Sequence, residues 1–415
     1  MRYILKHKEY ELLFFDREGT EITSVIVKEE NLDRLPLTVR GIFIDPAGCI
    51  EKAEADYLFL SDEGIYLFDL WLVNRSASAD RSDLRFIIPG NKSVTDWMLD
   101  NHSLSFTDCY WTETMEESLS WEEIRLKPEQ LKQYITIDGS ADINSLMRHG
   151  SNASLGGQLV KYWFVKQENI LALHKQTSGM DEILGIREKF ASLIYERQGI
   201  NACKYELTFQ DETVNGCECN AFTDSDTELI TAYDLLSEYK LDQLEDTYEL
   251  IIKLAELKGL DLKQVANHID RQLIVDYLVF NRDRHLGNLG FLRDSESLRF
   301  TGVAPVYDSG SSRILEGKLP EEGPDVQVNS LYKTESEVIS HIRDFNSIDA
   351  SLLPSAEEYR RLLDLGRNLS QSRKDKLCKL YKERISHLER LQQSQKTPSY
   401  VMSDISKSNL KKVKL

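Results

Sequence analysis

The sequence lacks any long apolar run, and this absence excludes a membrane-spanning helix. A helix needs about 18 consecutive apolar residues to cross a bilayer, and no such run occurs in the 415 residues. The chain starts with Met1 to Lys8, which carry basic charge but no apolar segment of the kind found in secretion signals. We therefore expect a cytoplasmic protein that has no signal peptide and binds no membrane.

Cysteine is sparse, with 6 residues in the chain. Cys217 and Cys219 are too close together for a zinc-binding pair, and no second pair of ligands lies near them. Alternation along a β-strand accounts for their spacing better. This usage predicts free thiols in a reducing compartment.

Basic residues are in deficit. The chain has 51 Lys and Arg against 69 Asp and Glu, which gives a formal net charge of −18 at pH 7. Such a charge repels the phosphates of nucleic acids and the headgroups of anionic membranes. We therefore expect no direct contact with nucleic acid, and we assign most of the acidic residues to solvated surface.

Patterning along the chain predicts four parts. Residues 1–140 favour a β-rich N-terminal subdomain, with a hairpin of strands at 10–15 and 22–27 and further apolar runs at 66–73 and 104–111. Residues 141–225 favour strands at 159–165, 170–175, 205–209 and 216–222 and a helix at 181–197, the order of a kinase small lobe. Residues 226–395 favour helices at 228–240, 244–258, 263–280, 334–345 and 355–392, which would form a helical large lobe. The polar, lysine-rich residues 396–415 predict a disordered basic tail.

The most informative segment is a polar loop followed by an acidic residue. In Asn281-Arg-Asp-Arg-His-Leu-Gly-Asn288, Asp283 precedes Asn288 by five residues, and Asp308 follows Asn288 by twenty. Phosphoryl transfer from ATP needs one carboxylate to accept or orient the hydroxyl proton, and an amide oxygen and a second carboxylate to hold magnesium. We therefore predict a kinase site in which Asp283 is catalytic and Asn288 and Asp308 bind Mg²⁺. The alternative is a polar loop between a helix and a hairpin, in which His285 only caps backbone groups.

A loop of small residues precedes the strand predicted at 159–165. It reads Gly150-Ser-Asn-Ala-Ser-Leu-Gly-Gly157, and Gly150, Gly156 and Gly157 could let backbone N–H groups approach phosphates. No Gly-Lys-Ser/Thr follows, so the loop is not a Walker A motif. An ordinary turn is the alternative.

Nucleotide phosphates also require a lysine, which a carboxylate on a helix usually holds. Lys175 ends the second predicted strand and Glu188 lies on the following helix, so these two form the natural pair. Lys161 and Glu182 are the rival lysine and carboxylate, and a weak surface ion pair is the alternative. By position alone, Asn220 and Phe222, next to Cys219, fall on the segment that would join the lobes and meet adenine.

Together these segments resemble the HipA-type serine/threonine kinases, bacterial proteins whose fold is related to protein kinases and phosphatidylinositol kinases. The resemblance rests on residues 150–158, Glu188, the loop from Asn281 to Asn288, and Tyr307-Asp308. Residues 69–75, 81 and 104–111 are similar to the N-terminal region of HipA-like proteins from Gram-positive bacteria, so roughly residues 5–345 are covered. The resemblance implies an α+β, bilobal protein-kinase-like (HipA/phosphatidylinositol-kinase-like) fold with a β-rich N-terminal subdomain and a mostly helical C-terminal lobe.

The resemblance also implies ATP and Mg²⁺ as cofactors, Asp283 as the catalytic base and Lys175 as the phosphate lysine. In the family, autophosphorylation of a serine in the small-residue loop can swing the loop out and silence the kinase, and Ser151 and Ser154 are the matching residues. HipA toxins pair with a small DNA-binding antitoxin, so an antitoxin-like partner is implied, although nothing in this sequence shows one. The N-terminal part departs from that of the toxins, so toxin identity and a tRNA-synthetase substrate are not carried over.

Two other functions stay open. The catalytic loop of lipid kinases has the same Asp-Arg-His-x-x-Asn sequence, so this protein could instead phosphorylate a lipid or a small molecule. The acidic composition counts against a membrane substrate. The second alternative is a protein that keeps a kinase-like fold but only binds partners and does not catalyse a reaction. The presence of Asp283, Asn288 and Asp308 counts against it.

Overall fold

The computed structural model describes residues 1–43, 50–54, 56–79, 81, 83–88, 90, 92–135, 142–166, 169–177, 179–239, 246–310 and 326–395. For residues 50–54 and 180 it describes the backbone alone. The tail predicted at 396–415 lies outside the described residues. No helix in these ranges is long and apolar enough to cross a membrane.

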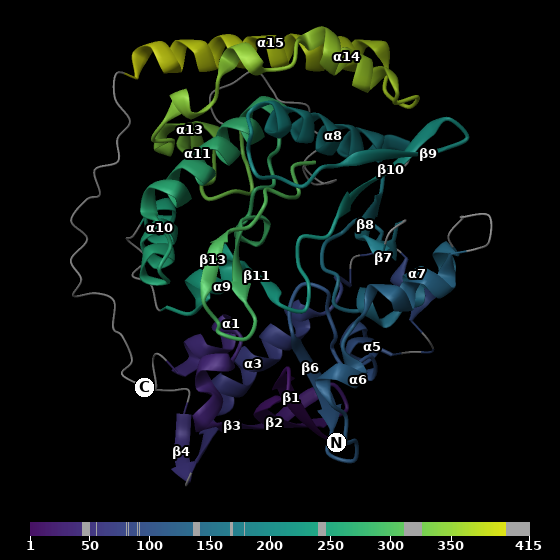
Figure 1. The fold of residues 1–415 in the computed structure, drawn as a ribbon, viewed down its shortest axis with the longest axis vertical. Coiled ribbons are helices and arrows are strands. Elements are labelled where there is room, and N and C mark those ends of the chain that lie inside the picture. Colours follow the sequence, from purple (N-terminus) through teal and green to yellow (C-terminus); the bar gives the residue numbers. More distant parts are fainter. Residues whose placement is uncertain are drawn as a thin grey trace.

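The N-terminal part is built on a six-stranded antiparallel sheet in the order β4-β5-β3-β2-β1-β6 (Figure 1). Its strands are β1 (Arg2–His7), β2 (Tyr10–Glu18), β3 (Glu21–Lys28), β4 (Ile50–Glu54), β5 (Tyr57–Leu60) and β6 (Tyr110–Thr114). The predicted hairpin is β2–β3. The helices and 3-10 turns around this sheet are η1 (Glu29–Arg34), α1 (Leu37–Arg40), η2 (Gly41–Phe43), α3 (Asp62–Arg75), α4 (Leu84–Ile87), α5 (Val94–Asp100), α6 (Trp121–Ile124), η3 (Pro128–Tyr134), α7 (Ile143–Arg148) and η4 (Gly150–Asn152).

The apolar run at 66–73 is helical, so grouping it with β-structure was wrong. Ser61 caps α3 by accepting a hydrogen bond from the Gly64 amide. Phe68 and Leu72 are fully buried and pack with the sheet residues, and Phe68 meets Phe15 edge-on at 5.3 Å between ring centroids. A continuous apolar run does not distinguish a buried helix from a strand, and here the cap and the four-residue spacing decide for helix. The run at 104–111 is also mostly non-strand, because only its last two residues enter β6.

The middle part is a four-stranded antiparallel sheet in the order β7-β8-β10-β9, close to the sequence prediction. It comprises β7 (Lys161–Val165), β8 (Leu171–Gln176), β9 (Glu206–Gln210) and β10 (Thr213–Asn220), with η6 (Gly179–Asp181) leading into α8 (Glu182–Arg197). Cys217 and Cys219 alternate along β10, as their spacing predicts, and both are buried. In Figure 1, α8 lies above this sheet, toward the helical end of the molecule.

The C-terminal part is mostly helical and holds a small antiparallel sheet. Its strands are β11 (Thr227–Thr231), β12 (Gly290–Asp294) and β13 (Phe300–Val303), in the order β11-β12-β13. Its helices and 3-10 turns are α9 (Ala232–Ser237), α10 (Thr247–Leu257), α11 (Leu262–Val279), η7 (Leu286–Asn288), α13 (Glu335–His341), η8 (Phe345–Ser347), η9 (Ala350–Leu352), α14 (Ala356–Asp364) and α15 (Gln371–Ser394). The helix predicted at 228–240 was partly wrong, because its first residues pair with β12 and α9 starts only after the Thr231 cap. The helix predicted at 355–392 is two helices, α14 and α15.

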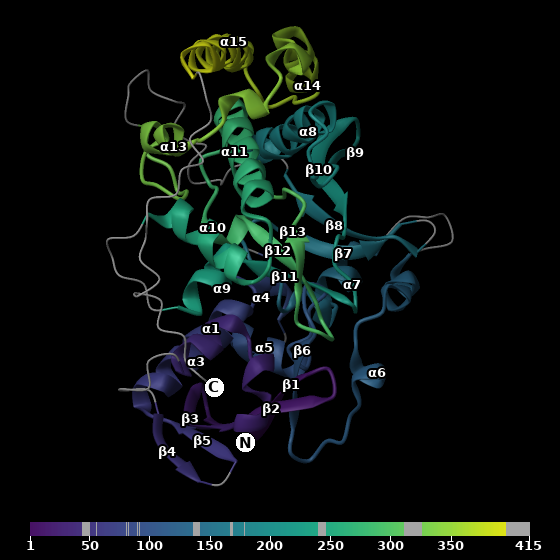
Figure 2. The same cartoon turned by 60° about the vertical axis from the view of Figure 1, so that its left-hand side comes forward.

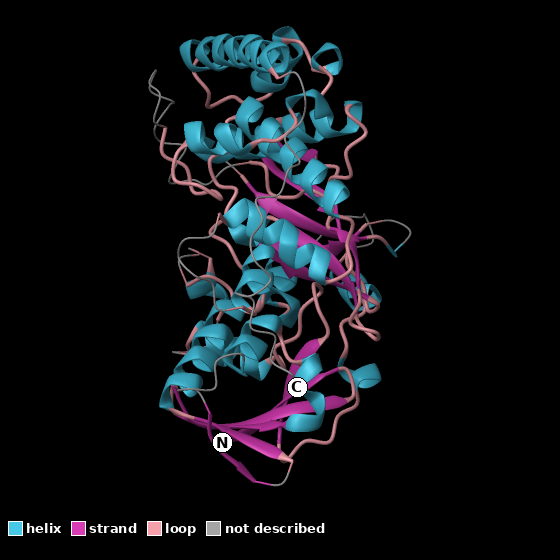
Figure 3. Ribbon diagram, turned by 90° about the vertical axis from the view of Figure 1, so that its left-hand side faces the viewer, coloured by secondary structure: helices cyan, strands magenta, loops and turns pink. Residues whose placement is uncertain are grey.

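The molecule is elongated, with the N-terminal sheet at one end and α14 and α15 at the other (Figures 2 and 3). The middle sheet and the hairpin β12–β13 lie between these ends, so the loop before β12 sits near the centre of the molecule. The four-part division of the sequence, with boundaries near 140 and 225, stays a prediction.

A buried polar network fastens the N-terminal sheet to the hairpin. Glu228 on β11 accepts hydrogen bonds from the Cys109 amide (2.9 Å) and from Arg293 Nη2 (2.8 Å), and it contacts His7 Nε2 at 3.0 Å. Burial by itself would raise the pKa of Glu228, but Arg293 and these hydrogen bonds outweigh it and lower the pKa to about 2. Glu228 is therefore ionised and joins β1, the residue that precedes β6, and β12 in one fully buried cluster.

Candidate active site

Three distant segments meet at one lysine. Lys175, on β8, donates a hydrogen bond from Nζ to Glu188 Oε1 on α8 (2.6 Å) and another to Asp308 Oδ1 (2.9 Å). The Ser309 amide donates to the other Glu188 oxygen at 2.8 Å, which fixes the segment after β13 against α8. The predicted Lys175–Glu188 pair thus forms, and Asp308 joins it.

Lys175, Glu188 and Asp308 are buried, and their pKa values depend on the charges of their neighbours. Burial by itself would lower the pKa of Lys175, but Asp308 and Glu188 raise it well above its usual value. Burial would likewise raise the pKa of Asp308, but Lys175 and Lys161 hold it well below its usual range. Burial raises the pKa of Glu188, yet its two short hydrogen bonds favour the ionised carboxylate. The result is a charged triad beside a second lysine.

The rival residues have different places. Glu182 accepts hydrogen bonds from the Arg367 and Asn368 amides, so it anchors the segment before α15 and does not pair with either lysine. Lys161 lies directly opposite Lys175 in the β7–β8 pairing. Its side chain is buried and makes no ion pair with another described residue, and burial lowers its pKa to about 8. Lys161 is therefore a cation near Asp308 that forms no direct ion pair with a carboxylate of the described residues.

The small-residue loop divides into a buried half and an open half. Gly150 packs against Asn101, so close that a Cβ would lie 2.3 Å from the Asn101 side-chain oxygen. Gly156 faces open space, and Gly157 has a φ of +90° and lies over Lys161, whose Nζ would be 2.5 Å from a Cβ. Of the glycines proposed for a phosphate cradle, Gly156 and Gly157 have the open backbone that a ligand needs, whereas Gly150 serves packing.

The two loop serines differ in access. Ser151 is 1% exposed and its hydroxyl lies 2.9 Å from His149 Nδ1. Ser154 is half-buried, and its hydroxyl makes a long 3.5 Å contact with the Ser103 carbonyl. Modification of Ser151 would therefore require the buried half of the loop to leave its site, whereas Ser154 already reaches the surface.

The loop that carries Asp283 is held by its own neighbours. Helix α11 ends at Val279, and its C-cap Phe280 adopts a left-handed conformation with a φ of 62°. Asn281 then accepts a hydrogen bond from the Asp283 amide (3.1 Å) and donates to Asp276 (2.8 Å). The Asp283 carboxylate accepts a hydrogen bond from Asn329 Nδ2 at 2.6 Å. Asp283 therefore sits on a fixed backbone while its carboxylate faces the surface.

A buried arginine ties this loop to the segment of Asp308. Arg284 pairs with Asp276 on α11 at 2.7 Å and donates to the Tyr307 carbonyl (2.6 Å) and the Ser309 hydroxyl (2.9 Å). The residues on both sides of Asp308 are thus held by the residue that follows Asp283. His285 accepts a hydrogen bond from the Gly287 amide (3.0 Å), which is the capping role that the alternative reading gave it.

The donor set suits a magnesium ion. Asn288 uses its Nδ2 to bond the Asp283 carbonyl (2.9 Å), so its amide oxygen accepts no hydrogen bond from another described residue. Asp308, which has a φ of 56°, binds Lys175 through one carboxylate oxygen and leaves the other available. No cluster of three or more His, Cys, Asp or Glu occurs within the described ranges. An amide and a carboxylate oxygen fit an ion that takes few protein ligands and keeps water and phosphate oxygens.

The segment proposed to meet adenine borders the same site. Asn220 is exposed at the end of β10, and the Ala221 amide continues the sheet by donating to the Leu171 carbonyl (2.9 Å). The Phe222 ring packs on Tyr307, 5.6 Å away between centroids, and Tyr307 donates from its hydroxyl to the Gly287 carbonyl (2.8 Å). The segment therefore contacts Tyr307, the residue before Asp308, through the ring of Phe222.

Sequence reasoning missed Asn329, Asp276 and Arg284. Asp276 and Arg284 stand within the segment that the motif singles out, and their charge on a buried helix and loop was an available signal. Asn329 lies 46 residues from Asp283 and carries no motif, so no local pattern points to it.

Neither a family model nor a curated protein matches the sequence. Among solved structures, the chain is similar to the HipA of Shewanella oneidensis MR-1 in a complex of HipA, HipB and operator DNA. The TM-score is 0.52 with 11% identity, over 94% of this chain and 97% of that chain. A likeness to the Helicobacter pylori proinflammatory kinase CtkA has a TM-score of 0.40 and 18% identity over 57% of this chain and 95% of that chain, and it carries no argument. The HipA likeness shows the fold alone: this chain has a mixed helix-and-sheet, HipA-like kinase fold with a β-rich N-terminal part and a helical C-terminal part.

Proposed function

We propose that this protein is a cytoplasmic kinase that uses ATP and Mg²⁺ to phosphorylate serine or threonine residues of a protein. The observation that carries the proposal is the meeting of Lys175, Glu188 and Asp308 beside the loop of Asp283. Strand β8, helix α8 and the segment after β13 contribute one member each. Such a lysine–carboxylate pair next to a metal-binding aspartate is what phosphoryl transfer uses. The HipA-like fold supports the same reading.

Each residue has a role that its surroundings allow. Glu188 holds Lys175 where its ammonium can contact nucleotide phosphates, and Lys161 adds a second cation under the open glycines. Asp283 would orient the substrate hydroxyl and take its proton, since its carboxylate is at the surface and its backbone is fixed. Asn288 and Asp308 would hold Mg²⁺, which when bound neutralises charge on the phosphates.

The proposal extends to nucleotide orientation and to regulation. Backbone groups near Asn220 and the ring of Phe222 would border adenine, and Gly156 and Gly157 would cover the phosphates. Autophosphorylation at Ser154, or at Ser151 after loop release, would place negative charge beside this loop and weaken nucleotide binding. A small DNA-binding, antitoxin-like partner is proposed only by analogy with the HipA–HipB complex.

The direct test compares wild type with Asp283→Ala. Among the described residues, the Asp283 carboxylate accepts one hydrogen bond, from exposed Asn329. The substitution should therefore leave the fold intact, which circular dichroism checks. Phosphoproteomics of cells expressing each form should show phosphoserine or phosphothreonine peptides that disappear in the variant. Loss of about 10²-fold or more in purified turnover is expected from removing a general base.

Three results would redirect the assignment. Equal turnover in wild type, Asp283→Ala and Asp308→Ala would rule out this site. Activity on inositol lipid vesicles with none on protein would favour a lipid kinase. A thermal-shift assay in which Mg-ATP stabilises neither form would support a non-catalytic interaction protein.

A further inference from the structure

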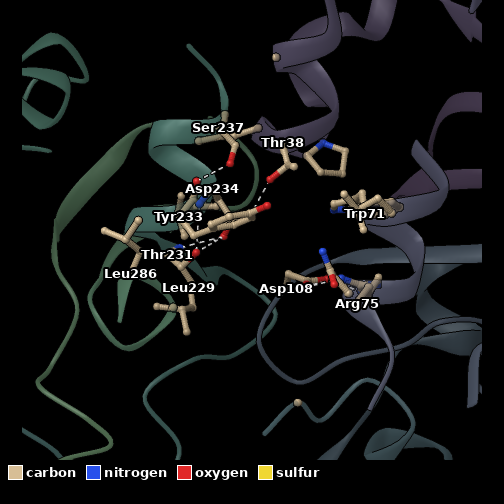
Figure 4. Close-up of a pocket in the computed structure, with 18 of the residues that line it drawn as sticks. Thr38, Trp71, Arg75, Asp108, Leu229, Thr231, Tyr233, Asp234, Ser237 and Leu286 are labelled. Atoms are coloured by element: carbon tan, nitrogen blue, oxygen red, sulfur yellow. Dashed lines mark hydrogen bonds and ion pairs between the residues drawn. The ribbon is translucent and has the colours of Figure 1, made fainter. Parts of the chain in front are cut away.

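A large cavity opens between the N-terminal part and the loop that carries Asp283. Its volume is about 910 Å³, within the range of sites that hold a ligand or several side chains. Figure 4 shows its two walls: Trp71 and Arg75 of α3 on one side, and Tyr233 and Leu286 on the other. The cavity therefore joins α3 to the α9 region and to the proposed catalytic loop.

The cavity leads to the proposed site of phosphoryl transfer. Asn329, one of its lining residues, donates the 2.6 Å hydrogen bond to the Asp283 carboxylate. The residues His285 to Gly287 and the loop residues Ser154 and Gly156 also line it. A chain segment lying in the cavity would consequently pass Asp283 at one end and the small-residue loop at another.

Apolar side chains continue from the cavity onto the surface of α3. Leu70 lines the cavity and is 40% exposed, and Tyr66 and Val73, one turn away on either side, are 65% and 47% exposed. Tyr233 on the facing wall is 45% exposed. Adjacent exposed apolar residues at the rim of a cavity are typical of a surface that binds another chain.

The charge of the lining is acidic. Arg75 is neutralised by Asp108, to which it donates two hydrogen bonds of 2.7 Å. Two acidic residues of the lining, Glu63 and Asp234, are not neutralised by a basic side chain of the described residues. Asp234 accepts hydrogen bonds from Thr38 and Thr231. Glu63 is exposed. With a chain charge of −18, this lining attracts cations and repels acidic segments, including a second copy of the chain.

We propose that the cavity and the α3 stripe of Tyr66, Leu70 and Val73 bind the phosphoacceptor segment of the protein substrate. The segment combines basic and bulky apolar side chains on either side of its serine or threonine. This inference rests on the proposed function and names the substrate class. The apolar side chains enter between Leu70 and Tyr233, the basic ones meet Glu63 and Asp234, and the hydroxyl reaches Asp283.

The test uses two pools of synthetic peptides with a central serine. One pool carries Lys, Arg and Leu in the flanking positions, and the other replaces Lys and Arg by Asp and Glu. Binding of fluorescent peptides to the full-length chain is measured by anisotropy, with Asp283→Ala included so that binding is read without turnover. Phosphate transfer is measured separately on both pools.

Two variants probe the surface. Glu63→Lys should raise KM for the basic pool about tenfold and lower that for the acidic pool, while kcat and the KM for ATP stay unchanged. Leu70→Ser should weaken binding of the basic pool several-fold. The matched controls are Glu389→Lys, an exposed change on α15, and Leu352→Ser, 46% exposed in η9, and neither should alter binding.

The outcomes separate the two proposals. Preference for the basic pool that both α3 variants reduce supports docking. Equal binding of the two pools, or α3 variants that behave as their controls, overturns the docking site even if phosphate transfer occurs. Selective binding without any transfer would refute the kinase assignment and leave a peptide-binding cleft. Concentration-dependent dimerisation that Leu70→Ser abolishes, with no peptide binding, would show that a second copy occupies the surface.

Discussion

Replacing Lys175 by Met tests how much the buried cluster of Lys175, Glu188 and Asp308 contributes to stability. The Lys175 side chain is 5% exposed and that of Glu188 is 3% exposed, so the substitution leaves a carboxylate buried without its cation. Breaking a buried ion pair in this way costs about 3–5 kcal/mol in the free energy of unfolding. Glu188→Gln should cost less, about 1.5–3 kcal/mol, because Lys175 keeps Asp308 as a partner.

The double variant distinguishes structure from catalysis. Lys175→Met with Glu188→Gln leaves no unpaired charge at the Glu188 position, so it should be less destabilised than the sum of the single changes. The expected coupling free energy is about 1–3 kcal/mol. Its turnover should nevertheless stay as low as that of Lys175→Met, since the phosphate lysine is absent in both.

Urea unfolding at pH 7, followed by tryptophan fluorescence, measures these differences. Lys189→Met is the matched control, because Lys189 lies on α8 next to Glu188 and pairs with exposed Glu206 at 2.6 Å. An exposed pair of this kind contributes at most about 1 kcal/mol. If Lys175→Met were no more destabilising than Lys189→Met, the buried cluster would not exist in solution and the reasoning would fail.

Two further predictions depend on pH. The pKa of Lys161 is lowered to about 8, so the protonated fraction, and with it the affinity for Mg-ATP, should fall about fivefold between pH 8 and 9. Lys161→Met should flatten this profile. Calorimetric titration checks both expectations, and a flat wild-type profile argues against phosphate binding by Lys161. The pKa of Glu228 is lowered from 4.5 to about 2, so its stabilisation is complete above pH 4.5 and is lost as pH falls toward 2. At about 1.4 kcal/mol per pKa unit it amounts to about 3 kcal/mol, and the gap in unfolding free energy between wild type and Glu228→Gln should shrink by about 2 kcal/mol from pH 7 to pH 3. An equal gap at both pH values would contradict this account of the Glu228–Arg293 pair.

Local order along the chain made much of the candidate site predictable. Asp283 and Asn288 lie in one loop, and their spacing does not depend on how the other segments pack. Lys175 and Glu188 were paired because a strand and the next helix are neighbours in most folds, and the structure confirms the pair. The same local reasoning failed for residues 66–73, because an apolar run satisfies both a strand and a buried helix until its packing partner is known.

The sequence by itself determined the residues of the proposed chemistry and the alternation of helices and strands, because both depend on near neighbours. Only the tertiary structure decided between Lys161 and Lys175 as the partner of Glu188, brought Asn329 to Asp283, and placed α3 across the cavity from α9. These outcomes depend on contacts between segments tens to hundreds of residues apart. A charged side chain needs a partner where it is buried, and the sequence alone does not show which charged residues are buried.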